Sequence, residues 1–132
     1  MLRRLVVFIF VFSFVILTGC GLETKTLTQF YEGDINKVSK IVILDGNTGY
    51  KKTIEDKKTI ESFLSEIKDI KFIPDENQEA RSGFNYAIGL YQNGVDDFSF
   101  GLTQINDHYY HTEPDIFLIV DNFYTNLDIK EE

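Results

Sequence analysis

The side chains that could carry chemistry are few in this 132-residue chain. It contains one cysteine, Cys20, and two histidines, His108 and His111. A single thiol cannot form an internal disulfide or a cysteine-rich zinc site. The thiol remains available for covalent modification, and it stands at the end of an apolar leader. Cys20 is therefore the candidate modification site.

The leader has the pattern of a secretory signal. Arg3 and Arg4 precede a mostly apolar run over residues 5–17, which is shorter than the ~20 residues of a membrane-spanning helix. The segment 17–20, Leu-Thr-Gly-Cys, resembles the lipobox of bacterial lipoproteins. That resemblance implies a diacylglyceryl group on the Cys20 thiol and cleavage before Cys20. A plain signal peptide, or an anchor helix with an incidental cysteine, is the alternative.

These features predict three segments: a lipoprotein signal peptide over 1–19, a lipidated N-terminus and tether over 20–36, and a single domain over 37–132. Two acyl chains, such as palmitate, anchor a protein stably where one holds it only marginally. We therefore expect a cell-membrane lipoprotein on the extracytoplasmic face, with the membrane as its partner through Cys20. Cleavage leaves 11 basic and 21 acidic residues, a formal charge of −10. Anionic lipid repels this charge, so we expect the domain to stand off the surface.

The overall composition narrows the function classes further. The full chain has 21 acidic and 13 basic side chains, whereas a nucleic-acid-binding protein needs a basic surface to meet phosphates. Its 43% apolar content indicates a folded domain rather than disorder. We expect no nucleic-acid partner.

The spacing of the two histidines does not predict a metal site, and neither does the spacing of the acidic residues. His108 and His111 lie on a predicted strand over 108–111, where residues three apart point to opposite faces. The polar loop over 74–82 is rich in carboxylates and amides, but its spacing does not match a calcium-binding loop. We assign no catalytic, cofactor-binding or metal-binding residue, and no cofactor.

Hydrophobic periodicity predicts the secondary structure. Strands are expected over 38–44, 50–54, 84–90, 98–102 and 108–111. A first helix is indicated by one apolar face, with Asp56 as its N-cap; the face consists of Ile60, Phe63, Leu64, Ile67 and Ile70. A second helix is expected over 114–127, with a strand as the alternative.

The hairpin over 84–102 can be predicted in register. A three-residue loop over 92–94 places both apolar rows on one face. The predicted pairs are Ile88–Phe98, Tyr86–Phe100 and Phe84–Leu102. Small or polar residues then form a flat patch on the other face, which is either covered or free to receive a strand, peptide or glycan; they are Asn85, Ala87, Gly89, Ser99 and Gly101.

Together these elements predict an α+β domain of order ββαβββα. An antiparallel sheet of about five strands carries two helices on one face.

Besides the lipobox-like segment, three short segments resemble the YhfM-like group of small lipoproteins from Gram-positive bacteria. They are Lys40-Ile41-Val42-Ile43, residues 54–60 with the sequence IEDKKTI, and Gly83-Phe84-Asn85-Tyr86. The resemblance implies location and fold, and it transfers no catalytic residue.

The function expected first is a non-enzymatic binding or accessory module with an unknown protein or envelope partner. One alternative is a glycan- or peptide-binding domain that exposes Tyr91, Tyr109 and Tyr110 as an aromatic platform. Another is a small envelope enzyme with paired carboxylates. The ligand, pathway and oligomeric state do not follow from the sequence.

Overall fold

The computed structural model describes residues 21–132, so the predicted signal peptide and the lipidation of Cys20 lie outside the described residues. The first half of the chain forms β1 (Lys25–Thr26), α2 (Leu27–Phe30), the 3₁₀ helix η1 (Ile35–Lys37), β2 (Lys40–Asp45), β3 (Lys51–Ile54) and α3 (Lys57–Ile67). The second half forms β4 (Lys71–Pro74), β5 (Tyr86–Gln92), β6 (Val95–Gly101), β7 (Gln104–Ile105), β8 (His108–Glu113) and α4 (Ile116–Asn126). None of these helices is long and apolar enough to cross a bilayer.

The α+β class is confirmed, but the single five-stranded sheet is wrong. The strands form two antiparallel sheets, with orders β3-β2-β5-β6 and β1-β4-β8-β7. The second sheet exists because β8 pairs with β4, a strand that the sequence interpretation missed, rather than with β6. Phe72 of β4 and Phe100 of β6 meet edge to face at 6.2 Å and join the two sheets in one core.

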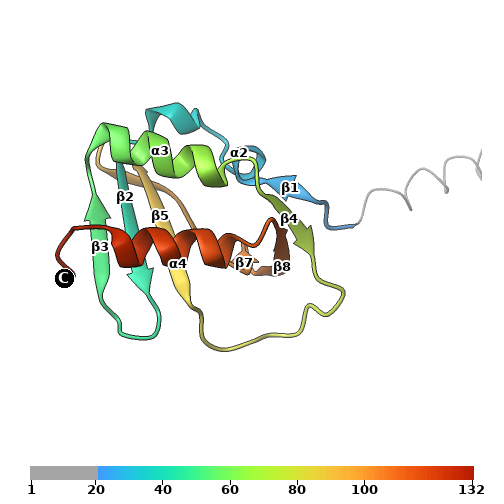
Figure 1. Ribbon diagram of the computed structural model, residues 1–132. Coiled ribbons are helices and arrows are strands. Elements are labelled where there is room, and N and C mark those ends of the chain that lie inside the picture. Colours follow the sequence, from blue (N-terminus) through green and yellow to red (C-terminus); the bar gives the residue numbers. More distant parts are fainter. Residues whose placement is uncertain (1–20) are drawn as a thin grey trace, which may run out of the picture.

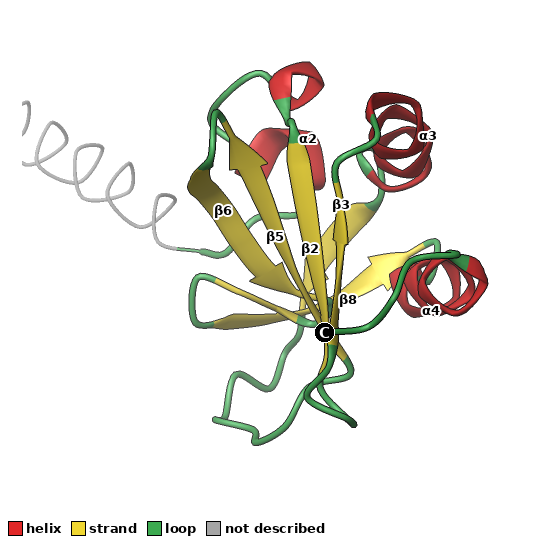
Figure 2. Ribbon diagram, turned by 90° about the vertical axis from the view of Figure 1, so that its left-hand side faces the viewer, coloured by secondary structure: helices red, strands yellow, loops and turns green. Residues whose placement is uncertain are grey.

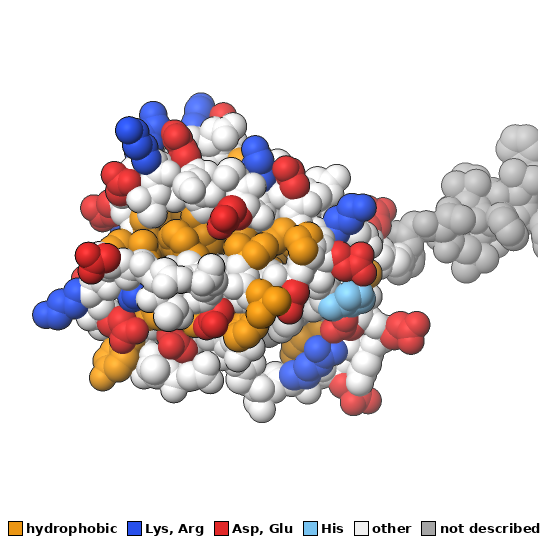
Figure 3. All heavy atoms as spheres, in the orientation of Figure 1, with side chains coloured by type: hydrophobic (Ala, Val, Ile, Leu, Met, Phe, Trp, Pro, Cys, Tyr) orange, Lys and Arg blue, Asp and Glu red, His pale blue; other side chains and the backbone are white. Residues whose placement is uncertain are grey.

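Helices α3 and α4 lie side by side, as both ribbon views show (Figures 1 and 2). Their contact includes a stacked pair, Phe63 and Phe123, with ring centroids 4.1 Å apart. The predicted apolar face of α3 is confirmed, since Ile60, Phe63, Leu64 and Ile67 are all buried. Apolar side chains form a band between the two helices on the molecular surface (Figure 3).

The predicted start of the first helix is confirmed, whereas the second helix begins at Ile116, two residues after its predicted start. Asp56 caps α3, and its Oδ2 accepts the Thr59 amide at 3.0 Å and the Thr59 hydroxyl at 2.6 Å. These bonds stabilise the carboxylate and lower the pKa of Asp56, the hydroxyl bond having the larger effect. The chain over 116–126 is a helix rather than a strand, with Asp115 as its N-cap.

The predicted register of the 84–102 hairpin is wrong by two residues. Asn93 and Gly94 form a two-residue turn, and both adopt positive φ. A bulge then inserts one extra residue between the Tyr91–Asp96 and Leu90–Phe98 pairs. The observed core pairs are therefore Leu90–Phe98 and Ile88–Phe100. The bulge, rather than a longer loop, puts both apolar rows on the same face.

The predicted tether over 20–36 is wrong for residues 25–36, which belong to the domain. Leu27, Tyr31 and Ile35 are 0%, 3% and 6% exposed. A capping box holds the start of α2, in which Thr26 Oγ1 accepts the Gln29 amide and Gln29 Oε1 accepts the Thr26 amide. Apolar side chains at helical spacing thus fasten this segment to the core.

One buried charged side chain, Lys52, caps the C-terminal end of α4. Lys52 on β3 is 7% exposed, and its Nζ donates to the carbonyls of Tyr124 (2.7 Å) and Leu127 (2.9 Å) at the C-terminal end of α4. The ammonium also lies 4.6 Å from the Tyr124 ring centroid. Carbonyls at a helix C-terminus lack helical partners and carry partial negative charge, so Lys52 satisfies them.

We predict that Lys52→Met lowers the free energy of unfolding by about 1.5–3 kcal/mol, the usual contribution of hydrogen bonds to a charged group. Urea denaturation measures this change. The matched control is Lys51→Met, because the Lys51 side chain is exposed on the same strand. Equal stability of the two variants would contradict the capping role.

Candidate functional site

The two histidines do not form a site together. His108 and His111 are both exposed, and His111 Nδ1 contacts Asp75 Oδ1 at 2.8 Å. Across residues 21–132, no cluster of three or more His, Cys, Asp or Glu side chains is arranged to hold a metal ion.

The acidic loop over 74–82 is fastened to the second sheet by its own side chains. Asp75 Oδ2 pairs with the Arg81 guanidinium at 3.1 Å. Gln78 exchanges two hydrogen bonds with the Tyr109 backbone, each 2.9 Å long. The Arg81 guanidinium lies 4.5 Å from the centroid of the Tyr109 ring. These contacts hold the loop over Tyr109 and explain its polar residues.

The three tyrosines considered for an aromatic platform do not share a surface. Tyr109 and Tyr110 are 7% and 4% exposed, so the platform is not formed. Tyr91 lies on the outer face of the first sheet, opposite α3 and α4, with the Lys40 ammonium 4.4 Å from its ring centroid.

The flat patch predicted on this outer face is partly covered by the protein itself. Tyr91 folds across Gly89, where an added Cβ would lie 3.0 Å from Tyr91 Cε2. Gly89 therefore provides the space in which the tyrosine ring rests, and less of the patch is left for a ligand.

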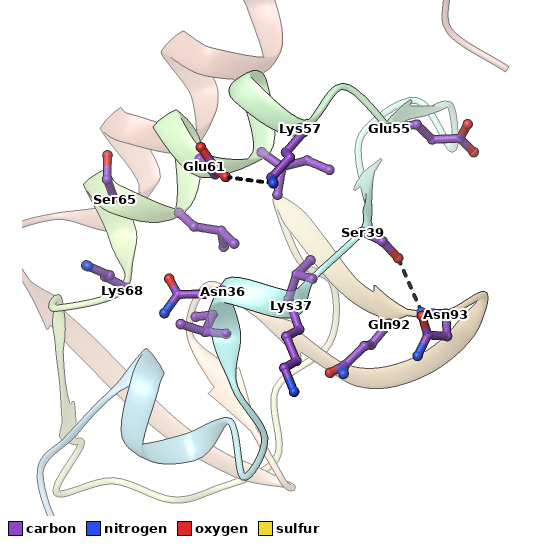
Figure 4. Close-up of a pocket in the computed structure, with 14 residues that line it drawn as sticks. Asn36, Lys37, Ser39, Glu55, Lys57, Glu61, Ser65, Lys68, Gln92 and Asn93 are labelled. Carbon is purple, nitrogen blue, oxygen red and sulfur yellow. Dashed lines mark hydrogen bonds and ion pairs between the residues drawn. The ribbon is translucent and has the colours of Figure 1, made fainter.

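A groove of about 530 Å³ runs along α3 and is here called the α3 groove. Its walls are α3, the segment from η1 to β2, and the tip of the β5–β6 hairpin (Figure 4). Four apolar residues lie at its floor, Ile35, Val38, Ile60 and Leu64, and because each is buried only a small part of each faces the groove. Polar side chains surround this floor, including Asn36, Ser39, Ser65, Gln92 and Asn93.

Charge around the α3 groove differs from that of the whole chain. Three lysines line it, Lys37, Lys57 and Lys68, against two carboxylates, Glu55 and Glu61. Lys57 and Glu61 lie 4.0 Å apart and are both well exposed, so solvent screens their attraction. The groove thus combines an apolar floor with a slightly basic rim, on a chain of net charge −8.

Tyr31 positions the hairpin wall of the groove. Its hydroxyl donates to Asp97 Oδ2 at 2.5 Å and lies 3.3 Å from Gln92 Oε1. Burial, and then the hydrogen bond to Asp97, raise the pKa of Tyr31 to about 12. A second contact at the same tip is the Asn93 amide donating to Ser39 Oγ at 3.3 Å (Figure 4).

This arrangement suits binding of an extended segment that has apolar and polar groups. The described residues that line the groove include no histidine or cysteine. Sequence reasoning missed the groove because Ile35 was assigned to the tether. The available signal was the spacing of Leu27, Tyr31, Ile35 and Val38, which follows a helical period.

Comparison with protein-family models, with curated proteins and with solved structures finds no significant similarity to this chain.

We predict that a spectrophotometric titration of the tyrosines contains a component near pH 12 that is reduced in Tyr31→Phe. A raised pKa in the folded state means that folding favours the neutral phenol. This contribution to stability is complete below the unfolded pKa near 10 and is lost as the pH rises through about 12. Tyr124 also has a pKa of about 12, because of burial and the nearby Glu131, so Tyr124→Phe is the matched comparison. An unchanged titration curve in Tyr31→Phe would contradict the assignment.

Proposed function

We propose that this protein is a lipid-anchored lipoprotein on the extracytoplasmic face of the cell membrane, and that its domain is a non-enzymatic binding or accessory module. One observation carries the proposal. The only cysteine of the chain closes an apolar leader in a Leu-Thr-Gly-Cys segment, and a folded domain begins with β1 five residues later. Membership in the YhfM-like group is part of the same proposal, and it is supported by the lipobox-like segment together with residues 40–43, 54–60 and 83–86.

The α3 groove is the surface that we assign to partner binding. Its apolar floor offers burial of hydrophobic side chains, and its polar rim offers hydrogen bonds that fix orientation. A protein segment or envelope component of mixed character fits this surface. The net negative charge of the chain does not favour a nucleic acid.

An envelope enzyme that worked in this groove would have Glu55 and Glu61 as its carboxylates. Both side chains are exposed. A carboxylic acid that donates a proton near neutral pH usually lies in an apolar pocket, which keeps it protonated. Binding therefore fits this groove better than paired-carboxylate catalysis.

The anchor is tested by Cys20→Ala. Without the thiol no lipid can be attached, so we expect the variant to leave the membrane fraction and to lose labelling by a fatty-acid analogue. Thr24→Ala, an exposed position beside the anchor, is the control that should stay in the membrane. Membrane retention and lipid labelling of Cys20→Ala would refute the anchor.

The groove is tested by photo-cross-linking from two serines of the same helix. Ser65 lines the α3 groove, whereas Ser62 faces the hollow between α3 and α4. With a photoreactive residue at either position of the lipidated protein in its native envelope, we expect a defined adduct from position 65 only. Identical adducts from both positions, or an adduct from position 62 alone, would contradict the assignment of the groove.

A further inference from the structure

The chain between Cys20 and the domain is short. β1 begins at Lys25, so the polypeptide from the lipidated residue to the first hydrogen-bonded strand spans five Cα–Cα steps. Fully extended, five residues reach at most about 18 Å. This inference rests on the proposed lipid anchor at Cys20.

The short linker over residues 21–24, here called the leash, joins the domain at a well-defined point. β1 pairs with β4, with Lys25 opposite Phe72 and Thr26 opposite Lys71. Just beyond β1, the Thr28 amide and hydroxyl both donate to the carbonyl oxygen of Lys68, at 3.1 and 3.0 Å. The leash therefore leaves the domain beside the C-terminal end of α3 and the start of β4. We call residues 25–26 and 68–71 the leash end of the domain.

The domain is larger than the leash is long. A chain of about 100 residues has a radius of gyration of about 13 Å, so the domain is roughly 30 Å across. The turn between β2 and β3 and the C-terminus lie at the other side of the molecule from β1 (Figure 1). A leash of about 18 Å does not let that side reach a bilayer in which Cys20 is anchored.

The charges at the leash end also suit a lipid surface. Lys25, Lys68 and Lys71 lie there together with one carboxylate, Asp69, and Glu23 lies on the leash itself. Elsewhere acidic residues predominate, since the chain as a whole carries 21 acidic and 13 basic side chains. Lysines close to anionic headgroups are attracted, so an anionic bilayer repels the leash end less than the rest of the domain.

We propose that the leash end lies against the outer surface of the cytoplasmic membrane. The leash end is then a second binding surface of the domain, with the bilayer as its partner, and this contact fixes the orientation of the domain. The α3 groove then runs away from the bilayer. Lys68 marks its near end, and Glu55 and Asn93, at the start of α3 and the hairpin tip, mark its far end (Figure 4). The far end of the groove therefore faces the space outside the membrane, from which a partner can enter it.

Energy transfer to the lipid surface tests this orientation. The Cys20 sulfur is a thioether in the lipidated protein, so an introduced cysteine is the only reactive thiol. A donor dye is placed at Asp69→Cys at the leash end, or at Asn47→Cys in the β2–β3 turn, both exposed positions. The lipidated proteins are reconstituted in phosphatidylglycerol–phosphatidylethanolamine vesicles that contain headgroup-labelled acceptor lipid. We expect severalfold more transfer from position 69 than from position 47.

A longer leash provides the control. Insertion of about 20 Gly and Ser residues between Glu23 and Thr24 adds a flexible segment that spans about 25 Å on average, and should reduce the difference between the two dyes. Suppose that the protein with its natural leash co-floats with the vesicles in a density gradient and that energy transfer from positions 69 and 47 is equal. That result would overturn the proposed orientation, whereas the lipid anchor would still be supported. Lipid-processed protein that does not float would instead refute the proposed anchor, and the orientation with it.

Discussion

The burial of Leu27 is the contact on which the rest of this molecule depends. Its side chain is fully buried, and it follows the capping residue Thr26 at the point where the chain enters the domain. Burying a leucine contributes about 1.5–3 kcal/mol, and the same segment adds the buried Tyr31 and Ile35. Because of this packing, residues 25–36, which the sequence predicted to be part of a tether, belong to the domain.

Two consequences follow from that packing. It shortens the free chain after Cys20, which restricts how the domain can sit on a membrane. It also places η1 beside α3, so that Ile35 becomes part of the floor of the α3 groove and Tyr31 reaches the hairpin through Asp97. The segment that would join the domain to the proposed anchor therefore also builds the candidate binding surface.

Much of the fold could be predicted because its elements follow local rules. The apolar period of α3, its cap at Asp56 and the helix after Asp115 all come from interactions within a few residues. Strand β4 was missed because its four residues, ending in Pro74, are too few to show a period, and only the pairing with β8 makes them a strand. The hairpin register was wrong by two residues. One comes from the turn, which has two residues instead of the predicted three, and the other comes from a bulge that shifts β6 by one residue.

The candidate site was less predictable than the fold. The α3 groove is formed by residues from η1, α3 and the hairpin tip, which are far apart in the sequence, so no local motif marks it. The chemistry-bearing residues that the sequence does mark, the two histidines and the acidic loop, hold the fold together or remain on the surface. Cys20 differs from these residues, because the proposed lipid modification is indicated by the residues next to it in the sequence.

The mass of the N-terminal peptide of the mature protein, isolated from the membranes of its own host, tests the central claim most directly. The account predicts a peptide that begins at Cys20 and carries the added mass of a diacylglyceryl group on sulfur. A peptide with a free Cys20 thiol, or a mature chain that begins at another residue, would contradict it.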